Sequence, residues 1–284
     1  MGDPAFTDTT GFKRLPARPR PGDWLDRFPE PGQTFEQYVA SRPNRPTSRR
    51  RTICLLPIGQ FPADRSPDVS RLRRFAEVFF GLPAKTLPSQ PLPERPTRLR
   101  QWGGRQWTQY RTDVFLDRVL PGALPKDGFC LVGVTMGDLY PNEQWNYVFG
   151  IASLRERVGI FSFARYYPQF WGEPDTAAAR GQALRRSLKV LAHEIGHMFG
   201  MQHCTAWRCG MNGSNNLEES DRRPIHLCPV CLKKLAWNGE LDVRARYRDL
   251  VSFYEEAGLK PEAAWVQRRL KAIGGAAGGP TTRP

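Results

Sequence analysis

The chain has 284 residues, 40% of them hydrophobic, and a formal net charge of +14, because 42 Lys and Arg residues outnumber 28 Asp and Glu residues. This length can bury a sizeable core in one or two domains, and no apolar run reaches the ~18 residues of a membrane-spanning helix. The basic residues are scattered and accompany no nucleic-acid-binding motif, so the charge indicates a solvated basic surface and no specific nucleic-acid partner.

The N-terminal region is rich in Pro, Arg and Gly and shows little hydrophobic periodicity. We therefore expect residues 1–51 to form an extended arm, with one short helix at 34–40. The region has no apolar segment of the kind that a secretory signal peptide contains. This favours a cytoplasmic or other intracellular reducing compartment, where thiols stay reduced.

From residue 52 the pattern changes to that of an α+β domain. Continuous apolar runs predict buried strands, and segments with helical periodicity lie between them. We expect strands at 52–58, 128–136 and 158–164, helices at 68–81 and 112–120, and a Pro- and Arg-rich loop at 88–110. This order predicts a mixed sheet with helices packed on it.

The next helix carries the most informative motif. Its apolar stripe is formed by Leu184, Leu188, Leu191 and Ile195, and its end is expected at Gly200. His193 and His197 are four residues apart, so both side chains project from one helix face. Glu194 lies beside them, and a turn at Gly200 allows His203 to return as a third ligand. Three imidazoles with one open position are typical of a catalytic zinc site.

The cysteines that follow suggest a second metal site. Four of the six cysteines fall into a C-x4-C pair and a C-x2-C pair, namely Cys204, Cys209, Cys228 and Cys231. This spacing favours a structural zinc site, and two disulfides are the alternative. His226 could compete as a ligand of this site, but four thiolates are expected. Cys54 and Cys130 lie in apolar runs and are interpreted as buried small hydrophobic residues.

The motifs together identify a resemblance to a known family. The pattern His193-Glu194-x-x-His197-x-x-Gly200-x-x-His203-Cys204-x4-Cys209-x-Met211, followed by Cys228-x-x-Cys231, is similar to that of the archaemetzincins, a branch of the metzincin zinc peptidases. The likeness covers about residues 50 to 240. It implies a metzincin-like mixed β-sheet with an active-site helix and a zinc-stapled C-terminal subdomain.

The resemblance also implies the roles of individual residues. It places a catalytic zinc on the three histidines, a second zinc on the four cysteines, and Met211 in a Met-turn beneath the catalytic metal. Glu194 is the implied general base. Some other metzincins have a Tyr two residues after the methionine, where this chain has Gly213. Archaemetzincins lack that Tyr as well, so the group that stabilises the oxyanion beside the zinc stays open.

The sequence divides into four expected regions. After the arm, residues 52–240 form the catalytic domain. Residues 241–273 form a helical hairpin from helices at 243–256 and 261–272, and residues 274–284 form a flexible tail.

The expected function is a zinc-dependent metallopeptidase acting on a peptide or protein substrate. A zinc-activated water attacks the peptide bond, and Glu194 takes its proton. The alternative is a zinc-stabilised binding protein with little or no hydrolytic activity. If it is a peptidase, we expect the substrate to pair as an added strand along the edge of residues 158–163.

Overall fold

The computed structural model describes residues 2–274, which form two compact units. Unit 1 contains the residues up to 45, residues 78–81 and those from 199 onward. Unit 2 contains residues 46–77 and 82–198. These units cross the domain boundaries expected at residues 51 and 240, which stay predictions. The expected tail lies outside the described residues from position 275 on.

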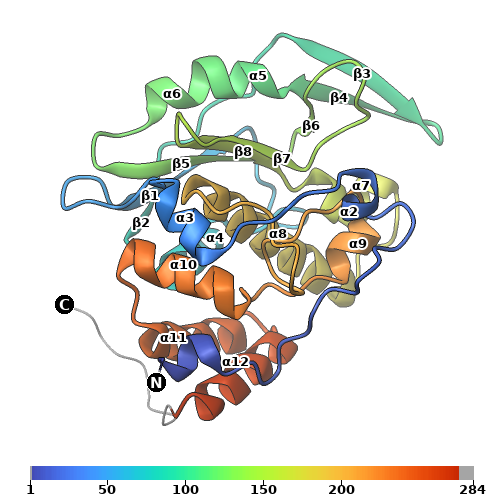
Figure 1. Ribbon diagram of the computed structural model, residues 1–284. Helices are drawn as coiled ribbons and strands as arrows, with labels where there is room; N and C mark the ends of the chain where they lie inside the picture. Colours follow the sequence, from blue (N-terminus) through green and yellow to red (C-terminus); the bar gives the residue numbers. More distant parts are fainter. Residues whose placement is uncertain (1, 275–284) are drawn as a thin grey trace. The chain divides into compact units, whose positions relative to one another are not determined.

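Unit 2 is built on a five-stranded sheet with the order β2-β1-β5-β8-β7 (Figure 1). Its strands are β1 (Thr52–Ile58), β2 (Ala84–Thr86), β5 (Gly128–Thr135), β7 (Gly150–Ser153) and β8 (Val158–Ser162). The first four in that order are parallel, and β7 runs antiparallel to β8 at the edge. The predicted strands at 52–58, 128–136 and 158–164 are confirmed as β1, β5 and β8. Their continuous apolar sequences suit strands that are buried on both faces.

The expectation that β8 forms an open edge is wrong. β8 pairs with β5 on one side and with β7 on the other, and all five of its residues are buried. The apolar composition of β8 therefore reflects an internal strand. The edge belongs to β7, whose four residues are half-buried.

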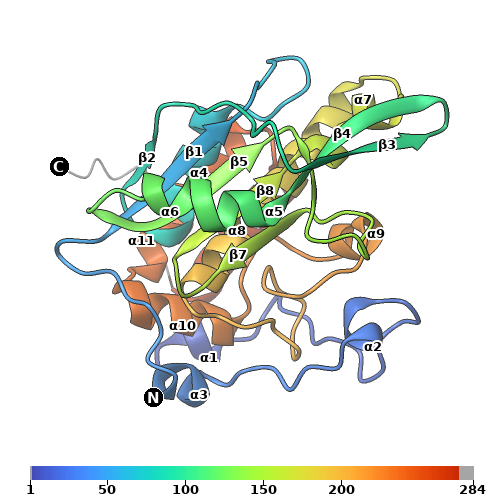
Figure 2. The ribbon, with the colours of Figure 1, turned by 90° about the horizontal axis from the view of Figure 1, so that it is seen from above.

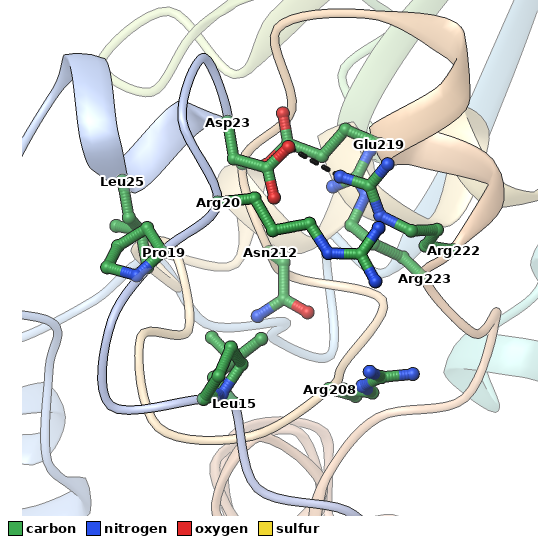
Figure 3. Close-up of a pocket in the computed structure, with 12 residues that line it drawn as sticks. Leu15, Pro19, Arg20, Asp23, Leu25, Arg208, Asn212, Glu219, Arg222 and Arg223 are labelled. Atoms are coloured by element: carbon green, nitrogen blue, oxygen red, sulfur yellow. Dashed lines mark hydrogen bonds and ion pairs between the residues drawn. The ribbon is translucent and has the colours of Figure 1, made fainter.

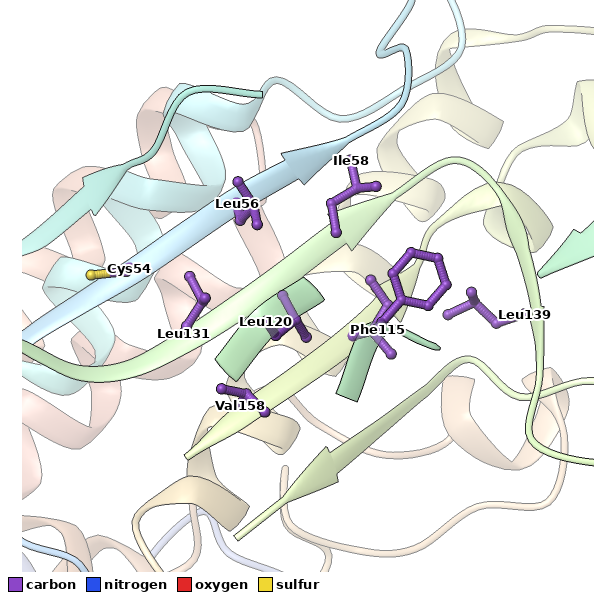
Figure 4. Close-up of a cluster of buried hydrophobic side chains, with 9 residues drawn as sticks. Cys54, Leu56, Ile58, Phe115, Leu120, Leu131, Leu139 and Val158 are labelled. Carbon is purple, nitrogen blue, oxygen red and sulfur yellow. The ribbon is translucent and has the colours of Figure 1, made fainter. Parts of the chain in front are cut away.

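One face of the sheet is covered by a helical segment between residues 112 and 123. The segment comprises α5 (Thr112–Val114), a π-helical turn (Phe115–Val119) and α6 (Leu120–Ala123). Figure 2 shows α5 and α6 lying over the strands of this sheet. Phe115 and Leu120 form one buried cluster with alternate residues of β1 and β8 and with Leu131 of β5 (Figure 4). Gly133 permits this approach, because a Cβ there would lie 3.0 Å from Leu120 Cδ2. The predicted end of this helical segment at residue 120 is wrong, because the segment continues to Ala123. Pro121 does not stop it, since proline is tolerated in the first turn of α6.

The other face of the sheet receives α8 (Ala177–Met198), the helix of the histidine motif. Its apolar stripe, formed by Leu184, Leu188, Leu191 and Ile195, is buried. The end of α8 comes close to β8, since a Cβ on Gly159 would lie 2.6 Å from Met198 Cε. The sheet thus fixes the end of α8 that carries the histidines.

A second sheet in unit 2 corrects the loop expected at 88–110. It contains β3 (Thr97–Trp102), β4 (Arg105–Arg111) and β6 (Asp138–Tyr140), in the order β3-β4-β6. The two residues between β3 and β4, Gly103 and Gly104, both have positive φ angles of 56° and 74°. A Gly-Gly pair with this geometry is typical of a two-residue hairpin, so a hairpin signal was present among the Pro and Arg residues.

A buried ion pair fixes the segment that leads into α8. Arg165 donates to both carboxylate oxygens of Asp138 at 2.7 Å, and Asp138 also accepts from the Trp107 indole and the Gln109 amide. Arg165 belongs to a 3-10 turn (Ala164–Tyr166) that precedes α7 (Pro168–Trp171). Because Asp138 accepts four hydrogen bonds, the buried ion pair can hold this segment in one conformation.

Unit 1 combines the N-terminal arm with the C-terminal helices. The arm contains α1 (Pro4–Thr7), α2 (Trp24–Arg27) and α3 (Phe35–Ala40). The C-terminal helices are α9 (Leu217–Asp221), α10 (Pro229–Gly239), α11 (Val243–Glu256) and α12 (Lys260–Ala272). Only the end of α4 (Val69–Phe80) belongs to unit 1. Helix α3 confirms the helix expected at 34–40 and begins with a capping box from Thr34 and Gln37. The expected pair of C-terminal helices is confirmed as α11 and α12.

The arm is packed tightly against the rest of unit 1. Tyr38 on α3 is fully buried, and its hydroxyl donates to the Phe199 carbonyl at 2.7 Å. Arg269 on α12 is buried and forms an ion pair with Asp8. No helix within residues 2–274 has the length and apolar character needed to cross a membrane.

Candidate metal centres

The histidine motif begins on the last two turns of α8. His193 is 8% exposed and His197 is half-buried, and their Nε2 atoms are 3.1 Å apart. The two rings are nearly perpendicular, at 89°, so the nitrogens converge while the rings avoid each other. Glu194 occupies the position between them in the sequence and is half-buried. The helix face predicted from the four-residue spacing is therefore confirmed.

The chain leaves α8 at Met198 and turns at Gly200, whose φ is +83°. A side chain at this position would be strained, which explains the glycine in the motif. The ligand atoms of His193, His197 and His203 lie within 4.8 Å of one another. The three histidines predicted from the sequence thus form one group.

This group fits a zinc ion. Two nitrogens bound to zinc at 2.0–2.1 Å with a tetrahedral angle lie about 3.3 Å apart, close to the 3.1 Å found for His193 and His197. Three neutral imidazoles leave one position of a tetrahedral shell open for a reacting group. The donor set and its spacing therefore suit a catalytic metal.

Glu30, on the N-terminal arm, holds the third histidine. His203 Nδ1 lies 3.0 Å from both carboxylate oxygens of Glu30. A proton on Nδ1 satisfies this contact and leaves Nε2 as the metal-binding atom, which is the arrangement that carboxylates impose on histidine ligands. Trp24 supports the carboxylate, since its indole donates to Glu30 at 2.8 Å and its ring packs edge-on against His203 at 5.2 Å. Sequence reasoning missed Glu30, which carries no local signal and lies 173 residues before His203.

The four predicted cysteines form a second group within unit 1. The sulfur atoms of Cys204, Cys209, Cys228 and Cys231 are buried and lie within 4.8 Å of one another. The Cys204 and Cys228 sulfurs are 3.7 Å apart, far longer than a disulfide bond of 2.03–2.05 Å. Two sulfurs bound to one zinc at about 2.3 Å would lie about 3.8 Å apart. All four thiols are free, so the geometry fits zinc and does not fit the disulfide alternative.

Several backbone groups prepare this cluster for thiolates. The amides of Cys228 and Met211 donate to the Cys209 sulfur at 3.2 and 3.4 Å. Hydrogen bonds from Cys209 and the other two thiols hold the pKa of Cys204 far below its usual value, whereas burial raises the pKa of Cys209. The two backbone amides can stabilise the Cys209 sulfur as a thiolate, the form that binds metal.

Asn212 is a second residue that sequence reasoning missed. Its side-chain oxygen accepts from the Cys209 amide at 2.8 Å, and its nitrogen donates to the carbonyls of Cys204 and Trp207. The preceding residue, Met211, is fully buried, and its carbonyl accepts from the Cys204 amide. Asn212 and Met211 thus fix the cysteine loop, while the role of Met211 beneath the catalytic metal stays a prediction.

The remaining candidates behave as the sequence indicated. His226 is not part of the four-cysteine group; its ring stacks on Trp265 at 3.6 Å. Cys54 and Cys130 are fully buried within the sheet of unit 2, and burial raises the pKa of Cys54 to about 11.

Comparison with known proteins gives three findings. The model of Peptidase family M54 matches residues 111–237. The chain is 36% identical to Archaemetzincin-2 of Rattus norvegicus, over 85% of this chain and 76% of that relative. It is 37% identical to Archaemetzincin-2 of Homo sapiens, over 83% of this chain and 73% of that relative. The crystal structure of archaemetzincin from Methanopyrus kandleri superposes with a TM-score of 0.50 at 30% identity, covering 68% of this chain and 97% of that one.

Proposed function

Since this chain belongs to the archaemetzincin family of zinc-dependent peptidases, we propose that it hydrolyses peptide bonds at the site of His193, His197 and His203, with Glu194 as the general base. The convergence of the three imidazoles carries the proposal. A zinc ion bound there would polarise the scissile carbonyl and make an attacking water more acidic. Glu194 would accept the proton of that water and return it to the leaving amine.

The remaining residues have separate tasks in this proposal. His193 and His197 hold their positions through α8, and His203 is held by Glu30. The four cysteines would hold a second zinc in a closed shell, which gives two zinc ions per chain. A closed shell cannot bind substrate, so the second metal would serve the structure alone.

A peptide library tests the proposal. The purified protein loaded with zinc is incubated with mixed peptides, and cleavage products are identified by mass spectrometry. We expect hydrolysis at defined bonds that a strong chelator abolishes and zinc restores. Absence of cleavage in the zinc-loaded protein would instead favour the zinc-stabilised binding protein.

We propose that Glu30 raises the zinc affinity of the histidine site. Glu30→Ala removes the acceptor for His203 Nδ1, so the ring loses its preferred tautomer and orientation. The zinc affinity should fall about 10- to 100-fold, as it does when such outer carboxylates are removed elsewhere. Competition with a chelator of known affinity measures this change, and the cysteine site serves as an internal reference.

Glu36→Ala is a matched control, because Glu36 is an exposed carboxylate on the same arm. It should leave the affinity unchanged. Glu30→Gln keeps an acceptor without the charge and should fall between wild type and Glu30→Ala. Equal zinc affinity in all variants would show that Glu30 has no positioning role.

We further propose that β7, in place of β8, accepts an extended substrate. β7 ends the sheet and packs against α8, which carries two of the three histidines. Its outer backbone groups can pair with a peptide strand. In a crystal structure with a peptide hydroxamate, the inhibitor backbone should bond to residues 150–153. An inhibitor that makes no such bonds would rule out this mode of binding.

A further inference from the structure

A small pocket in unit 1 lies between the N-terminal arm and the segment that follows the cysteine loop (Figure 3). Its volume is about 90 Å³. The arm contributes an apolar wall, and the later segment contributes mainly polar and charged side chains. We call it the arginine pocket, after four of its lining residues: Arg20, Arg208, Arg222 and Arg223.

The charges in the arginine pocket are unbalanced. Two carboxylates line it, and both have partners within the protein. Asp23 accepts from Arg222, and Glu219 accepts from the backbone amides of Trp24 and Asn215. Four arginines thus face two carboxylates that are already engaged.

Two of the four arginines form no ion pair within the part of the chain that the structure describes. Within residues 2–274, no carboxylate lies at ion-pair distance from Arg20 or Arg208, and both side chains are exposed. In Figure 3 their guanidinium groups lie on the same side of the pocket, with Pro19 and Leu25 opposite. A guanidinium fork of this kind matches the geometry of a carboxylate.

The indole ring of Trp24 connects the arginine pocket with the third histidine. Trp24 lies between two pocket residues, Asp23 and Leu25, and its ring packs against His203. Gly213 also lines the pocket and touches the same indole, because a Cβ there would lie 2.4 Å from Trp24 Cδ1. The Trp24 indole therefore contacts both His203 and a residue of the pocket, so one ring links the pocket to the surroundings of the histidine group.

We propose that the arginine pocket receives a carboxylate of the substrate, either an acidic side chain or the C-terminal carboxylate. This inference rests on the proposed peptidase function and names its substrate class. Arg20 and Arg208 bind the carboxylate, while Pro19 and Leu25 contact the methylene groups next to it. The small volume suits one such group.

The test compares peptides that differ in one charge. A peptide that the enzyme cleaves is varied to Glu, Gln or Lys at each position around the cleaved bond, and each peptide is made as free acid and as C-terminal amide. Wild type should prefer Glu over Gln by about tenfold or more in kcat/KM at one position, or prefer the free acid over the amide by that ratio. A preference for Glu identifies an acidic side chain as the source of the carboxylate, and a preference for the free acid identifies the C-terminus.

Variants link the preference to the arginine pocket. Arg20→Ala and Arg208→Ala should each reduce the ratio, and together they should bring it close to one. Arg208→Glu should shift the preference toward Lys. Arg155→Ala is the control, since this arginine is 95% exposed and lies outside the pocket, and it should preserve the wild-type ratio.

Binding separates this inference from the peptidase proposal. The affinities of the same peptides for the zinc-loaded Glu194→Gln variant are measured by calorimetry. Tighter binding of the acidic peptides that depends on Arg20 and Arg208 supports the pocket, even if wild type cleaves nothing. The inference is overturned if neither cleavage nor binding depends on the charge of the peptide. It is also overturned if both arginine variants retain the preference.

Discussion

Replacing Glu194 with Gln should lower kcat by about 100- to 10,000-fold, the usual contribution of a general acid–base residue. Gln has nearly the same size and shape as Glu but cannot accept a proton at neutral pH. The three histidines are untouched, so the zinc content should stay at the wild-type level. Steady-state cleavage of the best library peptide, elemental analysis and a thermal unfolding curve measure these three quantities.

The matched control for this substitution is Glu173→Gln, which removes an exposed carboxylate just before α8. It should retain wild-type kcat. If Glu194→Gln cleaves as fast as wild type, Glu194 is not the base. If the variant has lost its zinc, the drop in rate says nothing of proton transfer, and the zinc must first be restored.

Loss of the cysteine-bound zinc should have the largest effect on stability. Structural zinc sites contribute apparent binding free energies of about 10–16 kcal/mol at neutral pH, and this energy is released on folding. Cys231→Ser removes one of four buried ligands, so we expect a loss of more than about 4 kcal/mol in the free energy of unfolding and of one zinc per chain. Denaturant unfolding followed by Trp fluorescence, together with elemental analysis, measures both.

Cys54→Ala provides the comparison, because Cys54 is equally buried but belongs to the sheet of unit 2. It should cost about 1 kcal/mol and keep both metals.

Chelation should distinguish the two sites in wild type. A mild chelator should remove one zinc and the activity while the fold persists, because the histidine site has an open position and the cysteine site does not. A single zinc in the untreated protein, or a disulfide among these cysteines in cell extracts, would contradict the two-site proposal.

The parts of the fold that the sequence predicts are those with a strong local signal. β1 and β5 are long apolar runs, and α3 begins with a recognisable capping box. The strands β2 and β6 have three residues each, which is too short for a period to be visible. β7 is only half-buried and therefore lacks the apolar run that revealed β8. Without a signal for β7, the sequence predicts the edge at β8, because β8 is the strand directly before the active-site helix.

The candidate site shows the same division. Its metal ligands lie in two compact motifs whose spacing follows from helix geometry and from the coordination of zinc. Glu30 has no such constraint, because a carboxylate can approach His203 from any part of the chain. The arginine pocket depends likewise on tertiary contacts between residues 15–25 and 208–223. Only the folded structure brings these groups together.

The contact between Glu30 and His203 has a consequence for biosynthesis. Glu30 is synthesised 173 residues before His203, so it emerges from the ribosome long before the two side chains can form their hydrogen bond. At 5–20 residues per second, this interval lasts roughly 9–35 seconds. His193 and His197 lie within five residues of one helix, so local folding brings them together. The orientation of His203 requires in addition that the N-terminal arm has folded against it. The newly made enzyme should therefore acquire its catalytic competence as one of the last events of its maturation.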